Sequence, residues 1–283
     1  MPVFRIQYAS SLYVHLHHSW KQAQKLLKPG AAKHLALLGN IGAPESKKTK
    51  DFIRWCADNW EQVYCVPGAV ELKDFYTLNG LYERIPKNVH LLDQFTVQVN
   101  SHFMIAGCPL WTAHGKLISE FANWNEREQA LMAFKTPKEL RYYHEEDKQF
   151  LEESLKTAEA QLPYKNLVFL THQLPSSELL PSTQGSENTR KRLLYSGDIR
   201  ALLQNTRVSG CLSGAGETTV SGFLGNKAYC GVNPAFKSQD LVPNARYRPD
   251  MVASFQHRST LPKIPGLVNK FLSLPRPLVV VPT

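Results

Sequence analysis

The stretch "HLALLGNIGAPESKKTKDFIRWCADNWEQVYCVPG" (residues 34–68) has the pattern of a strand, a helix and a second strand. The apolar run at each end of the stretch is short and closed by glycine, which is typical of buried strands. Between the runs, residues 46–60 predict an amphipathic helix that places Phe52, Cys56 and Trp60 on its apolar side. Two strands joined by a helix with short connections predict a parallel βαβ unit.

The pattern extends in both directions from this unit. Residues 3–9 predict a strand, and the segment that follows predicts a helix with Ser19 as its N-cap and Pro29-Gly30 as its end. Further along the chain we expect a hairpin at 95–111, a helix at about 145–161, a buried strand from 167, a short helix around 198–204, and strands at 207–213, 218–223 and 227–232.

Composition excludes several classes of protein. The chain has 283 residues, 43% of them hydrophobic, which is typical of a globular protein with a sizeable core. No apolar run approaches the ~18 residues of a membrane span, and the N-terminus lacks the pattern of a signal peptide. We therefore expect an intracellular protein, soluble or within a large particle, that is not secreted. The cysteines are odd in number and scattered, which argues against a disulfide framework and against a structural zinc site.

The net charge is +9, and much of it lies near the C-terminus. Residues 245–283 contain six basic residues and one acidic residue, so they carry +5. A basic balance favours acidic partners, although a solvated basic surface without a partner has the same composition. No segment interleaves arginines and aromatic residues as an RNA-recognition motif does, so nucleic acid is a secondary candidate partner.

The last residues differ from the rest of the chain. The segment "LPKIPGLVNKFLSLPRPLVVVPT" (261–283) has five prolines, which exclude one continuous helix or a central strand. We predict a domain at 1–256 followed by a Pro-rich, basic extended arm at 257–283. The arm either lies on a partner protein or packs across its own domain. Its candidate partner-binding residues are Lys263, Lys270, Phe271 and Arg276.

The ends of parallel strands are where α/β proteins usually bind ligands. In this chain the expected strand ends read "ASSLYVHL", "LLGNIGAP", "VPGAVEL", "LTHQLPS" and "LSGAGET". In this order and at this spacing they resemble the blocks of the calcineurin-like metallophosphoesterases, which are D-x-H, G-D, G-N-H-E, a Thr-His pair and G-H-x-H. The resemblance covers residues 3–256, and "GCPLW" and "CGVNP" also match the single-domain branch. It implies one domain with an α/β fold, a four-layer α/β/β/α sandwich of two mixed sheets.

The resemblance also implies which positions once held metal. Here the aspartate and histidine of D-x-H are replaced by Ser11 and Tyr13, the bridging aspartate of G-D by Asn40, the asparagine and histidine of G-N-H-E by Ala69 and Val70, and the two histidines of G-H-x-H by Ala215 and Glu217. Only His172, of the Thr-His pair, is kept. The eight positions are therefore a degenerate form of the family's site.

The loss matters because the family's chemistry needs two metal ions held by carboxylates and imidazoles. A neutral Asn40 cannot bridge two dications as a carboxylate does, and Val70 replaces the expected general acid. We therefore expect no catalytic residues, no cofactor and no metal. The weak candidates for a single metal ion are His172, Asn40 and Glu217. Tyr13 and Val70 are expected to fill the space that the metals left, and His172 to be a core histidine held by a hydrogen bond.

Three histidines after the first expected strand, and one glutamate, are further candidate functional residues. His15, His17 and His18 could form a new metal site, but exposed histidines near a turn are common and no matching carboxylate pair accompanies them. Glu71 follows the lost histidine and is expected to cap or pair with its surroundings.

Three functions remain open from the sequence. The leading hypothesis is a non-catalytic pseudo-phosphoesterase that acts as a structural or binding component of a larger multi-subunit assembly, for example a virus capsid or an organellar ribosome. The second is a weak metal-dependent phosphoesterase with a single-metal site. The third is an anion or nucleic-acid binding module that uses the old cleft, although no Arg or Lys lies at the five strand ends.

Overall fold

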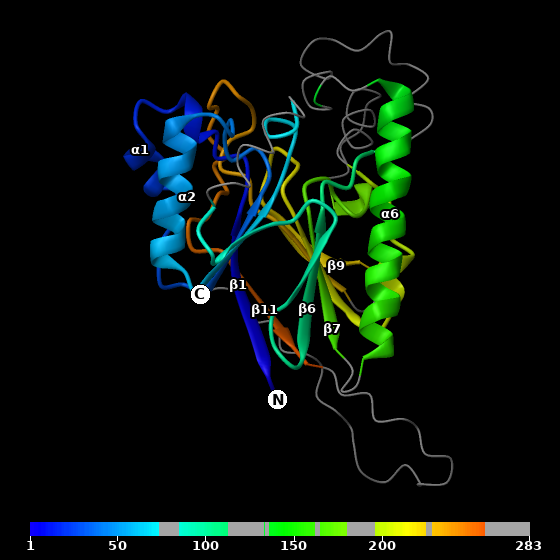
Figure 1. Ribbon diagram of the computed structural model, residues 1–283. Coiled ribbons are helices and arrows are strands. Elements are labelled where there is room, and N and C mark those ends of the chain that lie inside the picture. Colours follow the sequence, from blue (N-terminus) through cyan, green and yellow to red (C-terminus); the bar gives the residue numbers. More distant parts are fainter. Residues whose placement is uncertain are drawn as a thin grey trace, which may run out of the picture.

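Two mixed β-sheets form the centre of the molecule in the computed structural model (Figure 1). The residues that the structure describes are 1–73, 85–112, 133, 136–161, 165–179, 196–224 and 228–257. The predicted arm therefore lies outside the described residues from residue 258 onward, together with Lys263, Lys270, Phe271 and Arg276. The domain boundary at 256/257 stays a prediction.

The first sheet has five strands in the order β11-β1-β2-β3-β4. Its strands are β1 (Val3–Ala9), β2 (His34–Leu38), β3 (Gln62–Val66), β4 (Val89–Leu91) and β11 (Val252–Gln256). Strands β1 to β4 are parallel, as the βαβ pattern predicts, and β11 pairs antiparallel with β1. The sequence patterns did not indicate β11, which is the last described strand.

The second sheet has six strands in the order β5-β6-β7-β8-β10-β9. Its strands are β5 (Phe95–Gln98), β6 (Phe103–Cys108), β7 (Asn166–Thr171), β8 (Val208–Ser213), β9 (Val220–Leu224) and β10 (Ala228–Val232). The expected hairpin at 95–111 is β5 and β6, which pair antiparallel. Strands β6, β7, β8 and β10 are parallel, and β9 closes the far edge antiparallel to β10.

The sheets pack face to face with helices outside, so the predicted four-layer sandwich is confirmed (Figure 1). The alternation of side chains along β2 shows how one sequence supplies two cores. Ala36 and Leu38 face the second sheet, and Leu35 and Leu37 face the outer helices. A third core lies between the second sheet and α6 (Pro137–Ala160), where Leu151 packs with residues of β6 and β7.

The long helix α6 starts earlier than the sequence patterns indicate. We expected it from about residue 145, and it begins at residue 137 with a capping box between Thr136 and Glu139. The threonine side chain accepts the Glu139 N–H, and the glutamate reaches back to the Thr136 N–H. This Thr-x-x-Glu spacing is a known signal for the start of a helix, which the irregular composition of 113–145 had obscured.

Two other helices are shorter than expected. Helix α2 (Lys47–Asn59) matches the prediction, but α1 comprises only Trp20–Gln24. After it, the N–H groups of Leu26 and Leu27 bond to carbonyls three residues back, so the chain tightens into turns before Pro29. The helix expected at 198–204 is the 3₁₀ turn Leu202–Gln204, and two further 3₁₀ turns comprise Val14–Leu16 and Ser177–Leu179. None of the helices in the described ranges is long and apolar enough to cross a membrane.

Candidate functional site

The five predicted strand ends meet at one edge of the sandwich. The Ser11 N–H donates to the Gly39 carbonyl at 3.0 Å, which joins the ends of β1 and β2. The Gly214 N–H donates to the Thr171 carbonyl at 3.1 Å, which joins the ends of β8 and β7. The Ser10 hydroxyl donates to the Gly214 carbonyl at 2.7 Å and so links the two sheets. The parallel arrangement therefore brings the degenerate blocks together, because parallel strands share a carboxyl edge.

Both polar atoms of the Asn40 side-chain amide form hydrogen bonds at this edge. Its Nδ2 donates to the Tyr13 hydroxyl at 3.4 Å, and its Oδ1 accepts the Val70 N–H at 3.1 Å. Asn40 and Tyr13 are both buried, and both have a left-handed backbone, with φ of 55° and 45°. Such a backbone is uncommon for residues other than glycine, so the loops are held firmly in place. Tyr13 and Asn40 thus form a polar contact where the resemblance implies metal ligands.

His172 is buried and faces the backbone of the first sheet. Its Nδ1 lies 3.1 Å from the Leu38 carbonyl oxygen. Because a carbonyl only accepts, Nδ1 carries the proton and donates, and the lone pair is on Nε2. Burial lowers the pKa of His172 to about 4, so the ring is neutral near pH 7. This is the strand-end hydrogen bond that we expected of a core histidine.

Two glycines pack directly against these side chains. A methyl group at Gly68 would lie 2.8 Å from His172 Cε1 and 2.9 Å from Asn40 Oδ1, and one at Gly39 would lie 2.3 Å from His172 Nδ1. Distances below 3.0 Å are overlaps, so there is no room for even one more carbon atom beside either glycine. The structure thus brings Asn40 and His172 together, and it packs them tightly.

Glu71 ties the loops of this edge together. Its Oε2 accepts the N–H groups of Asn40 and Gly68 at 2.9 and 2.8 Å, and its Oε1 accepts those of Ile41 and Gly42 at 2.7 and 3.0 Å. Burial raises the pKa of Glu71, and the backbone N–H donors oppose that rise. The glutamate therefore binds the two loops that follow β2 and β3, in agreement with the expectation that it caps its surroundings.

The remaining degenerate positions offer few ligands. Ala69 and Ala215 are buried and carry no lone pair. Glu217, half-buried, follows Ala215 by two residues. Asn40 and His172 already bond within the protein, at both amide ends and at Nδ1 respectively. In the part of the chain that the structure describes, no group of three His, Cys, Asp or Glu side chains is placed to hold a metal ion. These residues do not fit the carboxylate-rich centre that two-metal chemistry needs.

The histidines after β1 point to different backbone groups. His15 Nδ1 accepts the Ala43 N–H at 3.2 Å, and His17 Nε2 lies 2.9 Å from the Leu12 carbonyl oxygen. The His17 ring also packs on Phe236 at 5.4 Å between centroids. The structure therefore does not bring these two rings to a common ligand, and each has a local structural role.

The comparisons with solved structures agree with this architecture. A phosphopantetheinyl hydrolase from Mycobacterium tuberculosis aligns with 83% of this chain and 90% of its own, at a TM-score of 0.58 and 11% identity. The chain has the calcineurin-like metallophosphoesterase fold. A second crystal structure aligns with 89% of this chain and 95% of its own, at a TM-score of 0.53 and 14% identity. A dimetal phosphatase from Danio rerio has a TM-score of 0.49 at 10% identity, over 90% of this chain and 92% of its own. The sequence matches no family model and no curated protein.

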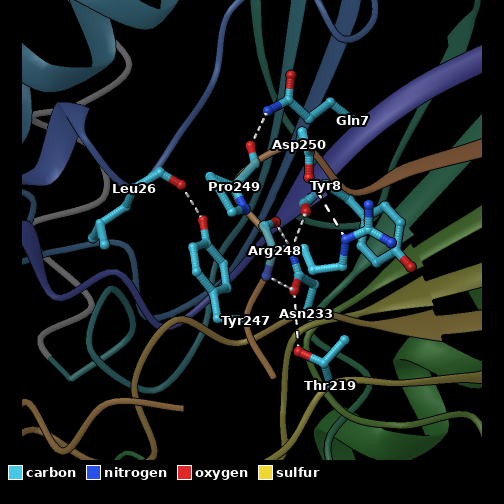
Figure 2. Close-up of polar contacts among 9 residues, drawn as sticks. All are labelled: Gln7, Tyr8, Leu26, Thr219, Asn233, Tyr247, Arg248, Pro249 and Asp250. Carbon is cyan, nitrogen blue, oxygen red and sulfur yellow. Dashed lines mark hydrogen bonds and ion pairs between the residues drawn. The ribbon is translucent and has the colours of Figure 1, made fainter. Parts of the chain in front are cut away.

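Asn233, at the end of β10, is a buried residue of this edge that sequence reasoning missed. Figure 2 shows its side chain between β1 and the loop before β11. Its Nδ2 donates to the carbonyls of Tyr8 and Arg248 at 3.0 and 2.8 Å, and its Oδ1 accepts the Arg248 N–H at 3.1 Å. The available signal was the Asn-Pro pair at a strand end, which marks a turn.

The buried ring of His172 predicts a loss of stability in acid. Its pKa falls from 6.5 in the unfolded chain to about 4 in the folded protein, so between these values only the unfolded state binds the proton. The free energy of unfolding should therefore fall by roughly 3 kcal/mol from pH 6.5 to pH 4 on account of this residue. Urea unfolding of the protein and of His172→Gln at several pH values measures it. Curves for the two proteins that stay parallel over this range would contradict the assignment.

Proposed function

We propose that this protein is a non-catalytic pseudo-enzyme of the phosphoesterase fold that serves as a structural and binding component of a larger assembly. One observation carries the proposal. At the positions where the resemblance implies metal ligands, Asn40 bonds to the Tyr13 hydroxyl and to the Val70 N–H, and His172 bonds to a backbone carbonyl. The amide of Asn40 and the Nδ1 of His172 therefore have hydrogen-bond partners within the protein.

Retention of the fold without its chemistry supports a binding role. The buried Glu71 and the left-handed loops keep the edge ordered although the ligands are replaced. The net charge of +9 favours an acidic partner, and the apolar, Pro-rich segment from 257 favours contact with a neighbouring chain. These features suit a component of an assembly better than an enzyme of small substrates.

Metal content and hydrolysis test the non-catalytic part. Protein soaked in manganese or zinc and then desalted should retain less than about a tenth of an equivalent by mass spectrometry, because the donor set cannot bind an ion tightly. Hydrolysis of bis-p-nitrophenyl phosphate should equal that of buffer with the same metal. His172→Ala is the matched variant. If the unaltered protein instead binds one equivalent of metal and hydrolyses the substrate, and His172→Ala does neither, the protein is the weak single-metal hydrolase that uses His172, Asn40 and Glu217.

The proposed role in a larger assembly is tested by sedimentation. The full chain and a chain that ends at residue 257 are added to an extract of the source cells and separated by sedimentation. The full chain should sediment with a large particle and the shortened chain should stay at the top of the gradient. Equal sedimentation of the two chains would remove the arm from the proposal.

A further inference from the structure

The two sheets of the sandwich differ in width. The first sheet has five strands and ends with β11, and the second has six and ends with β9. Phe255 of β11 packs over Gly210 of β8, where an added methyl group would lie 2.6 Å from Phe255 Cε1, and over the Tyr229 ring of β10, at 6.1 Å between centroids. The last strand of the first sheet therefore lies over β8 and β10, and β9 extends beyond it.

An apolar side chain is exposed on the part of the second sheet that extends beyond β11. Phe223 of β9 pairs in register with Tyr229, and the two rings meet edge to face at 6.0 Å between centroids. Tyr229 packs against the core between the sheets, so its neighbour Phe223 lies on the same inner face of the second sheet. Phe223 is nevertheless 46% exposed. One more strand beside β11 would lie over β9 and cover this ring.

Strand β11 has a free edge on the side where such a strand would lie. The His257 N–H donates to the Pro2 carbonyl at 3.0 Å, and the Tyr8 N–H donates to the Met251 carbonyl at 3.1 Å. Backbone groups alternate in direction along an antiparallel strand, so the odd-numbered residues of β11 bond to β1 and the even-numbered residues direct their N–H and C=O groups to the other side. The even-numbered residues are Val252, Ser254 and Gln256. In the part of the chain that the structure describes, no other strand pairs with them.

Residues 278–281, which lie outside the described residues, have the composition of a strand that fits this edge. They read Leu-Val-Val-Val, and consecutive valines favour an extended backbone packed against apolar neighbours. Pro277 and Pro282 flank the run, and proline is found at the ends of strands and at sheet edges rather than in central strands. We propose that residues 278–281 pair antiparallel with β11 as the sixth strand of the first sheet and cover Phe223.

The added strand comes from the same chain rather than from a second copy. The twenty residues 258–277 connect it to His257, which directly follows β11. A flexible linker of this length spans about 25 Å on average, well above the ~5 Å between neighbouring strands, so the chain can return to the edge that it leaves. Such a linker gives the segment an effective concentration of roughly millimolar at its own β11, which a second copy at micromolar concentration does not reach. The net charge of +9 also opposes pairing between copies.

The pairing makes the arm a loop that is closed at both ends. All four candidate partner-binding residues lie within residues 258–277, between the two strands. They therefore remain available to the assembly partner proposed above, on a segment whose two ends are fixed. The pairing itself does not depend on the proposed function, because it rests on the free edge of β11 and on the exposure of Phe223.

Amide hydrogen exchange of the full chain and of a chain that ends at residue 277, followed by NMR, tests the pairing. At least two of the N–H groups of Val252, Ser254 and Gln256 should exchange about 10-fold or more faster in the shortened chain, because their acceptors are removed. Full-length Val280→Pro, which removes an N–H from the added strand, should accelerate exchange at the same residues.

Two controls belong to the same experiment. The N–H groups of Ala253 and Phe255 bond to β1, so their exchange should not change. Val268→Pro places a proline in the loop and should leave every one of these N–H groups at the rate of the full chain. Equal exchange in the full and shortened chains would overturn the proposal. Protection that disappears on dilution, with a dimer of the 32.0 kDa chain in sedimentation equilibrium, would also overturn it, because the strand would then come from a second copy.

The exchange experiment is independent of the test of the assembly role. The full chain and the chain that ends at residue 277 both keep residues 258–277, so their sedimentation with a large particle is a separate measurement. Failure to sediment would remove the assembly role and leave the pairing intact. Unchanged exchange would remove the pairing and leave the assembly role intact.

Discussion

Replacement of Glu71 by alanine should lower the free energy of unfolding by at least about 4 kcal/mol, the largest effect that we expect of any single substitution in this protein. The carboxylate accepts four backbone N–H groups from two loops, and it is buried. Alanine would leave all four donors without an acceptor away from water. Each buried unsatisfied donor costs about 1–3 kcal/mol, and partial entry of water limits the sum.

A graded pair of variants separates the hydrogen bonds from the loss of volume. Glu71→Gln keeps one acceptor oxygen, so it should retain two of the four N–H contacts and lose about half as much stability, roughly 2 kcal/mol. Glu178→Ala is the control, because Glu178 is exposed and pairs with Arg200 on the surface; it should lose less than about 1 kcal/mol. Urea unfolding monitored by tryptophan fluorescence measures all three. A Glu71→Ala protein as stable as Glu178→Ala would show that other groups hold the loops.

The parallel βαβ unit could be predicted from the sequence because its signals are local, whereas the four layers were implied by the resemblance to the metallophosphoesterase blocks. Residues 34–68 contain both strands and the helix of a βαβ unit, and β2, α2 and β3 agree with the prediction to within two residues. Strands that are defined by pairing with a segment distant in the sequence were harder to predict. Strand β11 is defined by pairing with β1, about 250 residues earlier in the chain, and no local pattern reveals that pairing.

The location of the site was predictable, as were the backbone hydrogen bond of His172 and the capping role of Glu71, but the contacts between its side chains were not. Five strand ends in a known order placed Ser11, Tyr13, Asn40 and His172 at one edge, because parallel strands share their carboxyl end. The bond from Asn40 to Tyr13 depends on left-handed backbone at both residues, which tertiary structure imposes. The bond from Asn233 to the 244–250 loop likewise requires the folded arrangement of two edge segments.

Substitution of Gly39 by alanine should lower the free energy of unfolding by about 3 kcal/mol. Gly39 has φ of 82°, a conformation that costs other residues about 1 kcal/mol or more. Its methyl group would also lie 2.3 Å from His172 Nδ1 and 2.9 Å from the Gly68 Cα. Both neighbours are held, the first by the Leu38 carbonyl and the second by Glu71, so neither can move away freely. Thermal and urea unfolding measure the loss.

Gly30→Ala isolates the backbone part of this effect. Gly30 has φ of 91° and no atom within 4 Å of an added methyl group, so its loss should be about 1 kcal/mol. The additional loss of stability in Gly39→Ala, relative to Gly30→Ala, then measures the packing around His172. This additional loss should become smaller when His172→Ala is added, because the ring that the methyl group overlaps is removed. The comparison also bears on function, since a phosphoesterase must hold a phosphate and its metals beside this histidine. If Gly39→Ala is no more destabilising than Gly30→Ala, space remains beside His172, and tight packing would not support the proposed absence of catalysis.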